Sequence, residues 1–172
     1  MNGHIIATMV ALIIFLLATI WFARKKYKIN LSVLGLGAIV FFVSAQVLEK
    51  IVHLLVLRPQ RDGTIALMND NPFLYVLYAI AMAALFEETA RFIFFKWLEK
   101  KRKLECSDAL AYGLGHGGLE LLYIGIASLI NLFILFSAIQ SQNPKVLELL
   151  TENMLETIRT LAPWQVYLLG LE

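Results

Sequence analysis

Long apolar stretches alternate with short polar segments along this chain. The apolar stretches cover residues 5–22, 31–57, 72–98 and 108–139. A helix needs about 20 consecutive apolar residues to cross the hydrocarbon core of a bilayer. A further apolar run begins at Trp164, eight residues before the sequence ends at Glu172. The pattern predicts an all-α, polytopic transmembrane helix bundle with about four full spans and the start of a fifth. We expect residues 1–172 to form a single integral-membrane domain, the amino-terminal part of a longer bundle.

The composition supports a membrane protein and argues against other classes. Hydrophobic residues make up 59% of the chain and charged residues 16%, far from the averages of soluble domains. Membrane lipids are therefore the expected surroundings and partners. The net charge is +2, and the basic residues form two short clusters, so we expect no binding to nucleic acid. Cys106 is the single cysteine, which excludes an internal disulfide and predicts a free thiol.

The two basic clusters predict the orientation of the chain in the membrane. The first runs from Arg24 to Lys28, after span one, and the second from Lys96 to Lys103, after span three. Because positive residues collect on the cytoplasmic side, we expect the amino terminus to lie outside and span one to be an anchor. Apolar residues at three- and four-residue steps over 147–161 predict an amphipathic helix on the outer surface.

Three charged residues lie in the middle of the third apolar stretch: Glu87, Glu88 and Arg91. Each would cost roughly 3 kcal/mol if it were exposed to lipid, so these residues must be paired, hidden or functional. At about 100° per residue, all three lie on one face of a helix. Glu87 and Arg91 have the i, i+4 spacing of a favourable pair. We therefore expect Arg91 to hold one glutamate while the other, Glu88, faces the next span.

The fourth stretch carries a histidine among glycines, in the segment from Gly113 to Glu120. His116 and Glu120 are four residues apart, and the small residues around them allow a neighbouring backbone to approach closely. Counted from the ends of antiparallel spans, Glu88 and His116 both lie about 14 Å inside the cytoplasmic edge. Glutamate and histidine at one depth predict a site that activates water or binds a metal. A structural ion cluster and a proton relay use the same residue types, and both remain open alternatives.

A second polar stripe, formed by Gln46, Glu49 and His53 on span two, is more typical of packing or of side chains that reach the outer interface. Asn131, deep in span four, is typical of an interhelical hydrogen bond.

The two motifs together, Glu87-Glu88-x-x-Arg91 and the Gly113–Glu120 segment, resemble those of the YhfC-type family of intramembrane metalloproteases. That family is similar to the CAAX prenyl endopeptidases and bacteriocin-processing membrane enzymes. The resemblance implies a bacterial cell-membrane peptidase that cleaves a membrane-associated peptide or protein near the cytoplasmic face. It implies Glu87 or Glu88 as the base, His116 as its partner and Arg91 as the residue that orients them. The candidate metal ligands are His116, Glu88 and Glu120, with zinc as the candidate ion or the glutamate acting without metal.

The chain departs from the family pattern in one respect. The pattern continues with a further span that carries a second histidine followed by Asn or Asp, and nothing after Glu120 supplies it. We therefore expect these 172 residues to be incomplete as an enzyme. The alternative from another class is a non-catalytic membrane scaffold, or a proton-coupled transporter that uses Glu87, Glu88 and His116 as a relay.

Overall fold

The computed structural model describes residues 2–60 and 64–141, and this part of the chain is helical without strands. Four helical segments are long and apolar enough to cross a membrane: Asn2–Tyr27, Leu31–Leu57, Pro72–Lys101 and Cys106–Gln140. They agree with the four stretches expected from the sequence to within a few residues at each end. The prediction of an all-α transmembrane protein is therefore confirmed. The expected amphipathic helix at 147–161 and the start of a fifth span at 164 lie outside the described residues.

Two of the four membrane-spanning segments change helix type along their length. The first and third spans are α1 (Asn2–Tyr27) and α5 (Pro72–Lys101). The second consists of α2 (Leu31–Phe41), the π-helix η1 (Phe42–Glu49) and α3 (Lys50–Leu57). The short α4 (Ala66–Asp70) precedes α5. The fourth span consists of α6 (Cys106–Glu120), the π-helix η2 (Leu121–Ile126) and α7 (Ala127–Gln140).

Local capping explains where the second and third spans begin and end. The Asn30 side chain accepts a hydrogen bond of 2.8 Å from the Ser32 amide, and Asn71 accepts one of 3.1 Å from the Leu74 amide. Asparagine is a preferred N-cap because its side chain satisfies an otherwise free amide of the first turn. Pro72 follows in the first turn, where proline is well tolerated. Arg58 has a φ of 45°, a left-handed conformation that ends α3.

The chain divides into two compact units, and residues 2–26 and 120–141 are the described part of the first. Ile5 and Leu12 of α1 form its buried core together with Leu129 of α7. Asn2 donates a hydrogen bond of 3.0 Å to the Ser137 hydroxyl, so the start of α1 lies beside the end of α7. The two helices are therefore antiparallel, as alternate crossings of a membrane require.

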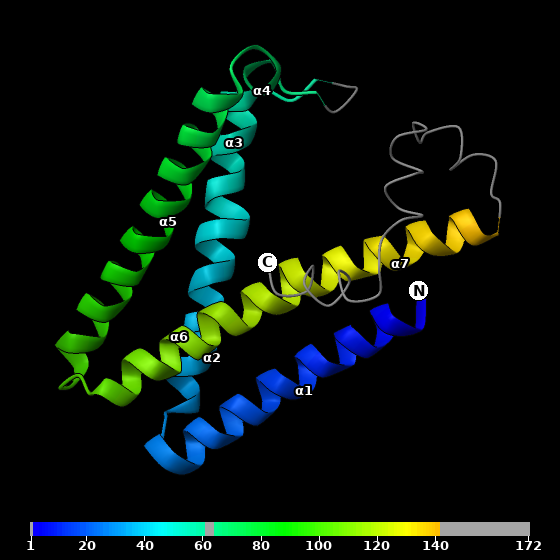
Figure 1. Ribbon diagram of the computed structural model, residues 1–172. Helices are drawn as coiled ribbons and strands as arrows, with labels where there is room; N and C mark the ends of the chain where they lie inside the picture. Colours follow the sequence, from blue (N-terminus) through cyan, green and yellow to red (C-terminus); the bar gives the residue numbers. More distant parts are fainter. Residues whose placement is uncertain (1, 61–63, 142–172) are drawn as a thin grey trace. The chain divides into compact units, whose positions relative to one another are not determined.

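The second unit, residues 27–119, contains α2, η1, α3, α4, α5 and almost all of α6. Figure 1 shows α5 running beside the second span. At the α2–α6 contact the backbones touch through glycines: a Cβ on Gly37 would lie 2.5 Å from the Tyr112 carbonyl oxygen, and one on Gly115 would overlap the Leu34 carbonyl. Such close approach is how small residues pack membrane helices. The sequence-based expectation of a single domain stays a prediction.

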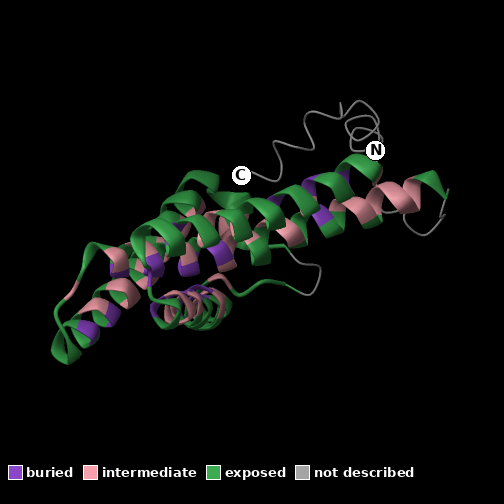
Figure 2. Cartoon of the chain, turned by 90° about the horizontal axis from the view of Figure 1, so that it is seen from below, coloured by how far each residue is buried: buried purple, intermediate pink, exposed green. Residues whose placement is uncertain are grey.

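Large apolar side chains cover the outer faces of the helices. Figure 2 shows exposed residues along most of each helix, and Phe15, Leu55 and Phe73 are each more than 60% exposed. A soluble protein rarely exposes apolar surface on this scale. These faces are suited to contact with lipid, which is what the span lengths require.

Candidate active site

His116 occupies a buried position on α6 between two aromatic rings. It is 7% exposed, and its ring centroid lies 4.8 Å from that of Phe41 and 5.8 Å from that of Tyr112. The glycine contacts between α2 and α6 bring Phe41 of the second span against this histidine. Within the described ranges, Nδ1 of His116 is buried and has no hydrogen-bond partner.

The other ring nitrogen of His116 faces Glu87 on α5. Its Nε2 lies 3.5 Å from Oε2 of Glu87, whose side chain is 28% exposed. This distance allows an ion pair but is long for a hydrogen bond, as is common in catalytic pairs without substrate. The expectation that Glu88 faces His116 was therefore wrong, and its neighbour takes that position.

Glu88 pairs with Arg91 instead. The Nη1 of Arg91 lies 3.0 Å from Oε1 of Glu88, and the Glu88 side chain is 64% exposed. The expected Glu87–Arg91 pair was wrong for a geometric reason. Arg91 lies about 40° from Glu87 and about 60° from Glu88 around the helix, so it can reach either. The neighbouring helix α6 determines which glutamate pairs with Arg91, because its His116 lies beside Glu87 and leaves Glu88 to the arginine.

Aromatic contacts fix the position of α5 against α6. Tyr112 is buried, and its ring centroid lies 4.9 Å from that of Phe94 and 5.1 Å from that of Phe95. Its hydroxyl has no hydrogen bond of normal geometry in the described residues, although the guanidinium of Arg91 is near enough to interact with it electrostatically. Tyr112 thus packs against His116 and lies near Arg91.

The Glu87–His116 pair fits two ligands of a zinc ion, but the expected ligand set does not assemble. Two ligands of a tetrahedral zinc at about 2.0–2.1 Å lie roughly 3.3–3.4 Å apart, close to the observed 3.5 Å. The described residues contain no group of three or more His, Cys, Asp or Glu side chains that could hold a metal. The expected set of His116, Glu88 and Glu120 is not formed, because Glu88 turns toward Arg91. Glu120 ends α6, where the other compact unit begins.

A second polar cluster, on the second and third spans, was not expected to be a hydrogen-bonded unit. Nε2 of His53 lies 3.1 Å from Oε1 of Glu49, and its Nδ1 lies 3.1 Å from the Tyr78 hydroxyl. Glu49 is 8% exposed, so it packs inside the unit. The signal in the sequence was the i, i+4 spacing of Glu49 and His53. Their partner Tyr78 comes from another span and could not be inferred from spacing.

The turn between α5 and α6 is held by an ion pair that the sequence analysis also missed. Arg102 donates two hydrogen bonds to the carboxylate of Asp108, one of them 2.8 Å long. Asp108 also accepts a bond of 3.0 Å from the Glu105 amide and is 2% exposed. The hydrogen bond to Asp108 raises the pKa of Arg102 above its ordinary value. This pair fixes the turn that brings α6 back beside α5, and with it His116 beside Glu87.

These features define a polytopic helical membrane protein in which a half-buried glutamate and a buried histidine from two spans lie side by side. The model of the YhfC intramembrane metalloprotease family matches residues 8–172, and the chain belongs to this family. The resemblance seen in the motifs is thus confirmed.

One relative is the "Uncharacterized membrane protein YhfC" of Bacillus subtilis (strain 168), which is 39% identical over 122 residues. The aligned part is 71% of this chain and 46% of the relative, so the chain spans about half the length of the protein it matches. No solved structure matches the chain.

Proposed function

We propose that this chain contributes the reactive glutamate and histidine of an intramembrane peptidase, which cleaves a membrane-associated peptide near the cytoplasmic face. The observation that supports this proposal is the 3.5 Å approach of Glu87 Oε2 to His116 Nε2, at a buried position between two spans. The family to which the chain belongs is named for the same class of activity. A carboxylate can act as the general base in amide hydrolysis, and an imidazole beside it can stabilise the oxyanion.

In the proposed reaction Glu87 is the general base. Its carboxylate takes a proton from a water molecule as the water oxygen forms a bond to the peptide carbonyl carbon. The tetrahedral intermediate then breaks at the carbon–nitrogen bond, and the proton on Glu87 passes to the leaving nitrogen. His116 lies beside the base and stabilises the oxyanion. If a zinc ion is bound, His116 would hold it and the ion would supply Lewis-acid polarisation, while Glu87 would keep its role as the base.

Arg91 and Glu88 have a positioning role in this proposal. Their ion pair neutralises two charges at the middle of a span, where each alone would cost roughly 3 kcal/mol. The guanidinium also lies near the Tyr112 hydroxyl, which packs beside His116. Loss of the ion pair should therefore change the position of the His116 ring without removing a reacting group.

A proton-coupled transporter is the second candidate, and the Glu49–His53–Tyr78 cluster favours it. A hydrogen-bonded glutamate, histidine and tyrosine on the interface of two spans resemble a proton relay in their residue types. The cluster and the Glu87–His116 pair both lie in the second unit. A relay needs a path for protons, whereas a peptidase needs a site open to substrate.

One experiment separates the two functions. Proteoliposomes that contain the full-length protein would carry a pH-sensitive dye inside and a fluorogenic peptide anchored by an apolar span in the bilayer. Peptide cleavage that disappears in Glu87→Gln and His116→Gln, without a change in proton flux, supports the peptidase. Unfolding in detergent should shift by no more than about 1–2 kcal/mol in both variants, because each keeps a polar side chain of similar size. Proton flux that depends on Glu87 and occurs without peptide cleavage would contradict the peptidase proposal and support the transporter.

A further inference from the structure

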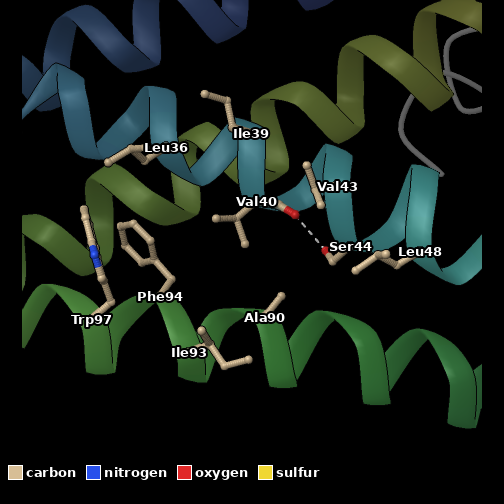
Figure 3. A pocket seen from close by; sticks show the side chains of 10 residues that line it. All are labelled: Leu36, Ile39, Val40, Val43, Ser44, Leu48, Ala90, Ile93, Phe94 and Trp97. Carbon is tan, nitrogen blue, oxygen red and sulfur yellow. Dashed lines mark hydrogen bonds between the residues drawn. The ribbon is translucent and has the colours of Figure 1, made fainter.

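An apolar groove of about 420 Å³ lies between the second span and α5. One wall comes from α2 and η1, from Leu36 to Leu48, and the other from α5, from Ala90 to Trp97 (Figure 3). The volume lies in the range of small-molecule sites. Several wall residues, such as Ile39 and Ile93, are more than half exposed, so the groove is open as far as the described residues are concerned.

The residues of the two walls are almost all apolar, which favours an aliphatic ligand. Ser44 is the one hydroxyl-bearing residue among them, and its hydroxyl already donates a bond of 2.8 Å to the Val40 carbonyl. A peptide backbone placed here would leave its amides and carbonyls without partners, at a cost of several kcal/mol for each group in lipid. A hydrocarbon chain has no such requirement. The groove therefore fits an acyl chain better than an extended peptide.

The length of the groove fits one leaflet. Leu36 and Leu48 are twelve residues apart on a continuous helical span, which corresponds to about 18 Å. Half of the hydrocarbon core of a bilayer is about 15 Å thick. The α5 wall, from Ala90 to Trp97, is shorter, at about 10 Å. Both walls are therefore of a length that lies within the reach of an acyl chain in one leaflet.

Positive charge marks the end of the groove at which a headgroup would lie. The Nζ of Lys101 lies 4.2 Å from the ring centroid of Trp97, the wall residue at that end. Lys100 precedes Lys101 in α5, and Lys103 follows in the connection to α6. Lys96 is already paired, since its Nζ lies 3.0 Å from Oε2 of Glu99. Tryptophan and lysine together are typical of the headgroup level of a membrane protein. Lysines at that level attract anionic lipids.

We propose that this groove binds an anionic phospholipid, with an acyl chain between α2–η1 and α5 and its phosphate at Lys101. The ligand is a lipid and not a helix of another protein, because the apolar walls end at Lys101, which has no acidic partner among the described residues. The proposal is independent of the peptidase reaction, since neither Glu87 nor His116 lines the groove.

The test uses Trp97 as a fluorescent reporter inside the groove. The full chain with Trp21→Phe and Trp164→Phe would be placed in phosphatidylcholine nanodiscs that contain a small fraction of lipid with brominated acyl chains. Bromine quenches tryptophan on contact. We expect brominated phosphatidylglycerol to quench Trp97 at about fivefold lower mole fraction than brominated phosphatidylcholine, the preference provided by one lysine near the headgroups. Lys101→Gln should abolish this preference.

Matched controls come from the chain itself. Lys25 stacks on Trp21 of span one at 5.1 Å in the same way, but neither lines the groove. Lys25→Gln should leave the preference at Trp97 unchanged. Ala90→Leu fills the groove and should weaken quenching by both lipids, while Ala84→Leu, on an exposed part of α5, should not. Equal quenching by the two headgroups, a preference that survives Lys101→Gln, or a Trp97 that neither lipid quenches because protein covers it would each overturn the proposal.

Discussion

Glu87 and Glu88 are adjacent in the sequence, yet they have different partners. Glu87 lies on the same face of α5 as Phe94 and Leu98, the two residues of this helix that are buried. This face points toward α6 and gives Glu87 access to His116. Glu88 is about 100° further around the helix and pairs with Arg91. The packing of one helix face therefore gives the two adjacent glutamates different partners.

The buried carboxylate of Asp108 gives a prediction at the same scale. Asp108→Asn should lower the free energy of unfolding by about 1.5–3 kcal/mol, because it weakens charge-assisted bonds at a site closed to solvent. Glu99→Gln is the matched control, since Glu99 forms an exposed pair with Lys96 that should contribute less than about 1 kcal/mol. Thermal unfolding in detergent measures both. Equal shifts in the two variants would show that the Arg102–Asp108 pair does not hold the turn.

At the scale of the elements, the crossing of α2 and α6 sets the position of His116. No side chain separates the two backbones at Gly37 and Gly115, so Phe41 can reach the histidine ring. Two π-helical segments, η1 and η2, occur in the second and fourth spans. Such segments are frequent at functional sites, and η1 carries both Ser44 of the groove and Glu49 of the polar cluster.

The glycines of α6 allow a test of this crossing. Gly115→Ala should destabilise the protein by about 1–3 kcal/mol or more, because the new methyl group would overlap the Leu34 carbonyl. Gly117→Ala has open space around the new Cβ and should be neutral or stabilising by up to about 1 kcal/mol through helix propensity. Unfolding in mixed detergent micelles measures the difference. Tolerance of alanine at both positions would contradict the close α2–α6 contact.

The elements also show how far the sequence alone could lead. The four spans were predictable because apolar length is a strong signal, and Asn30 and Asn71 are recognisable caps. The Gly113–Gly118 segment indicated close packing, but not that the partner would be α2. The choice between Glu87 and Glu88, the Arg102–Asp108 pair and the Tyr78 bond to His53 depend on tertiary contacts. Spacing along one helix carries no information about these contacts.

At the scale of the whole molecule, the connections between spans predict which side each end faces. The cluster after α1 and the cluster after α5 carry the excess of lysine and arginine, so both should be cytoplasmic. In a Cys106→Ser background, Asp70→Cys should react with a membrane-impermeant maleimide in intact cells. Lys25→Cys should react only after permeabilisation. The opposite result would invert the topology and place the Glu87–His116 pair nearer the outer face.

The central claim is that Glu87, paired with His116, is the base of a peptidase, and that Glu88 is not. The most direct test compares the cleavage rates of Glu87→Gln and Glu88→Gln on the same membrane-anchored fluorogenic peptide, with both variants checked for equal insertion. We predict that Glu87→Gln lowers the rate by about 10²–10⁴-fold, the usual contribution of a general base. Glu88→Gln should lower the rate by less than about tenfold, because Glu88 pairs with Arg91 and its loss affects the position of His116 without removing a reacting group. Loss of cleavage in Glu88→Gln with activity retained in Glu87→Gln would contradict the claim.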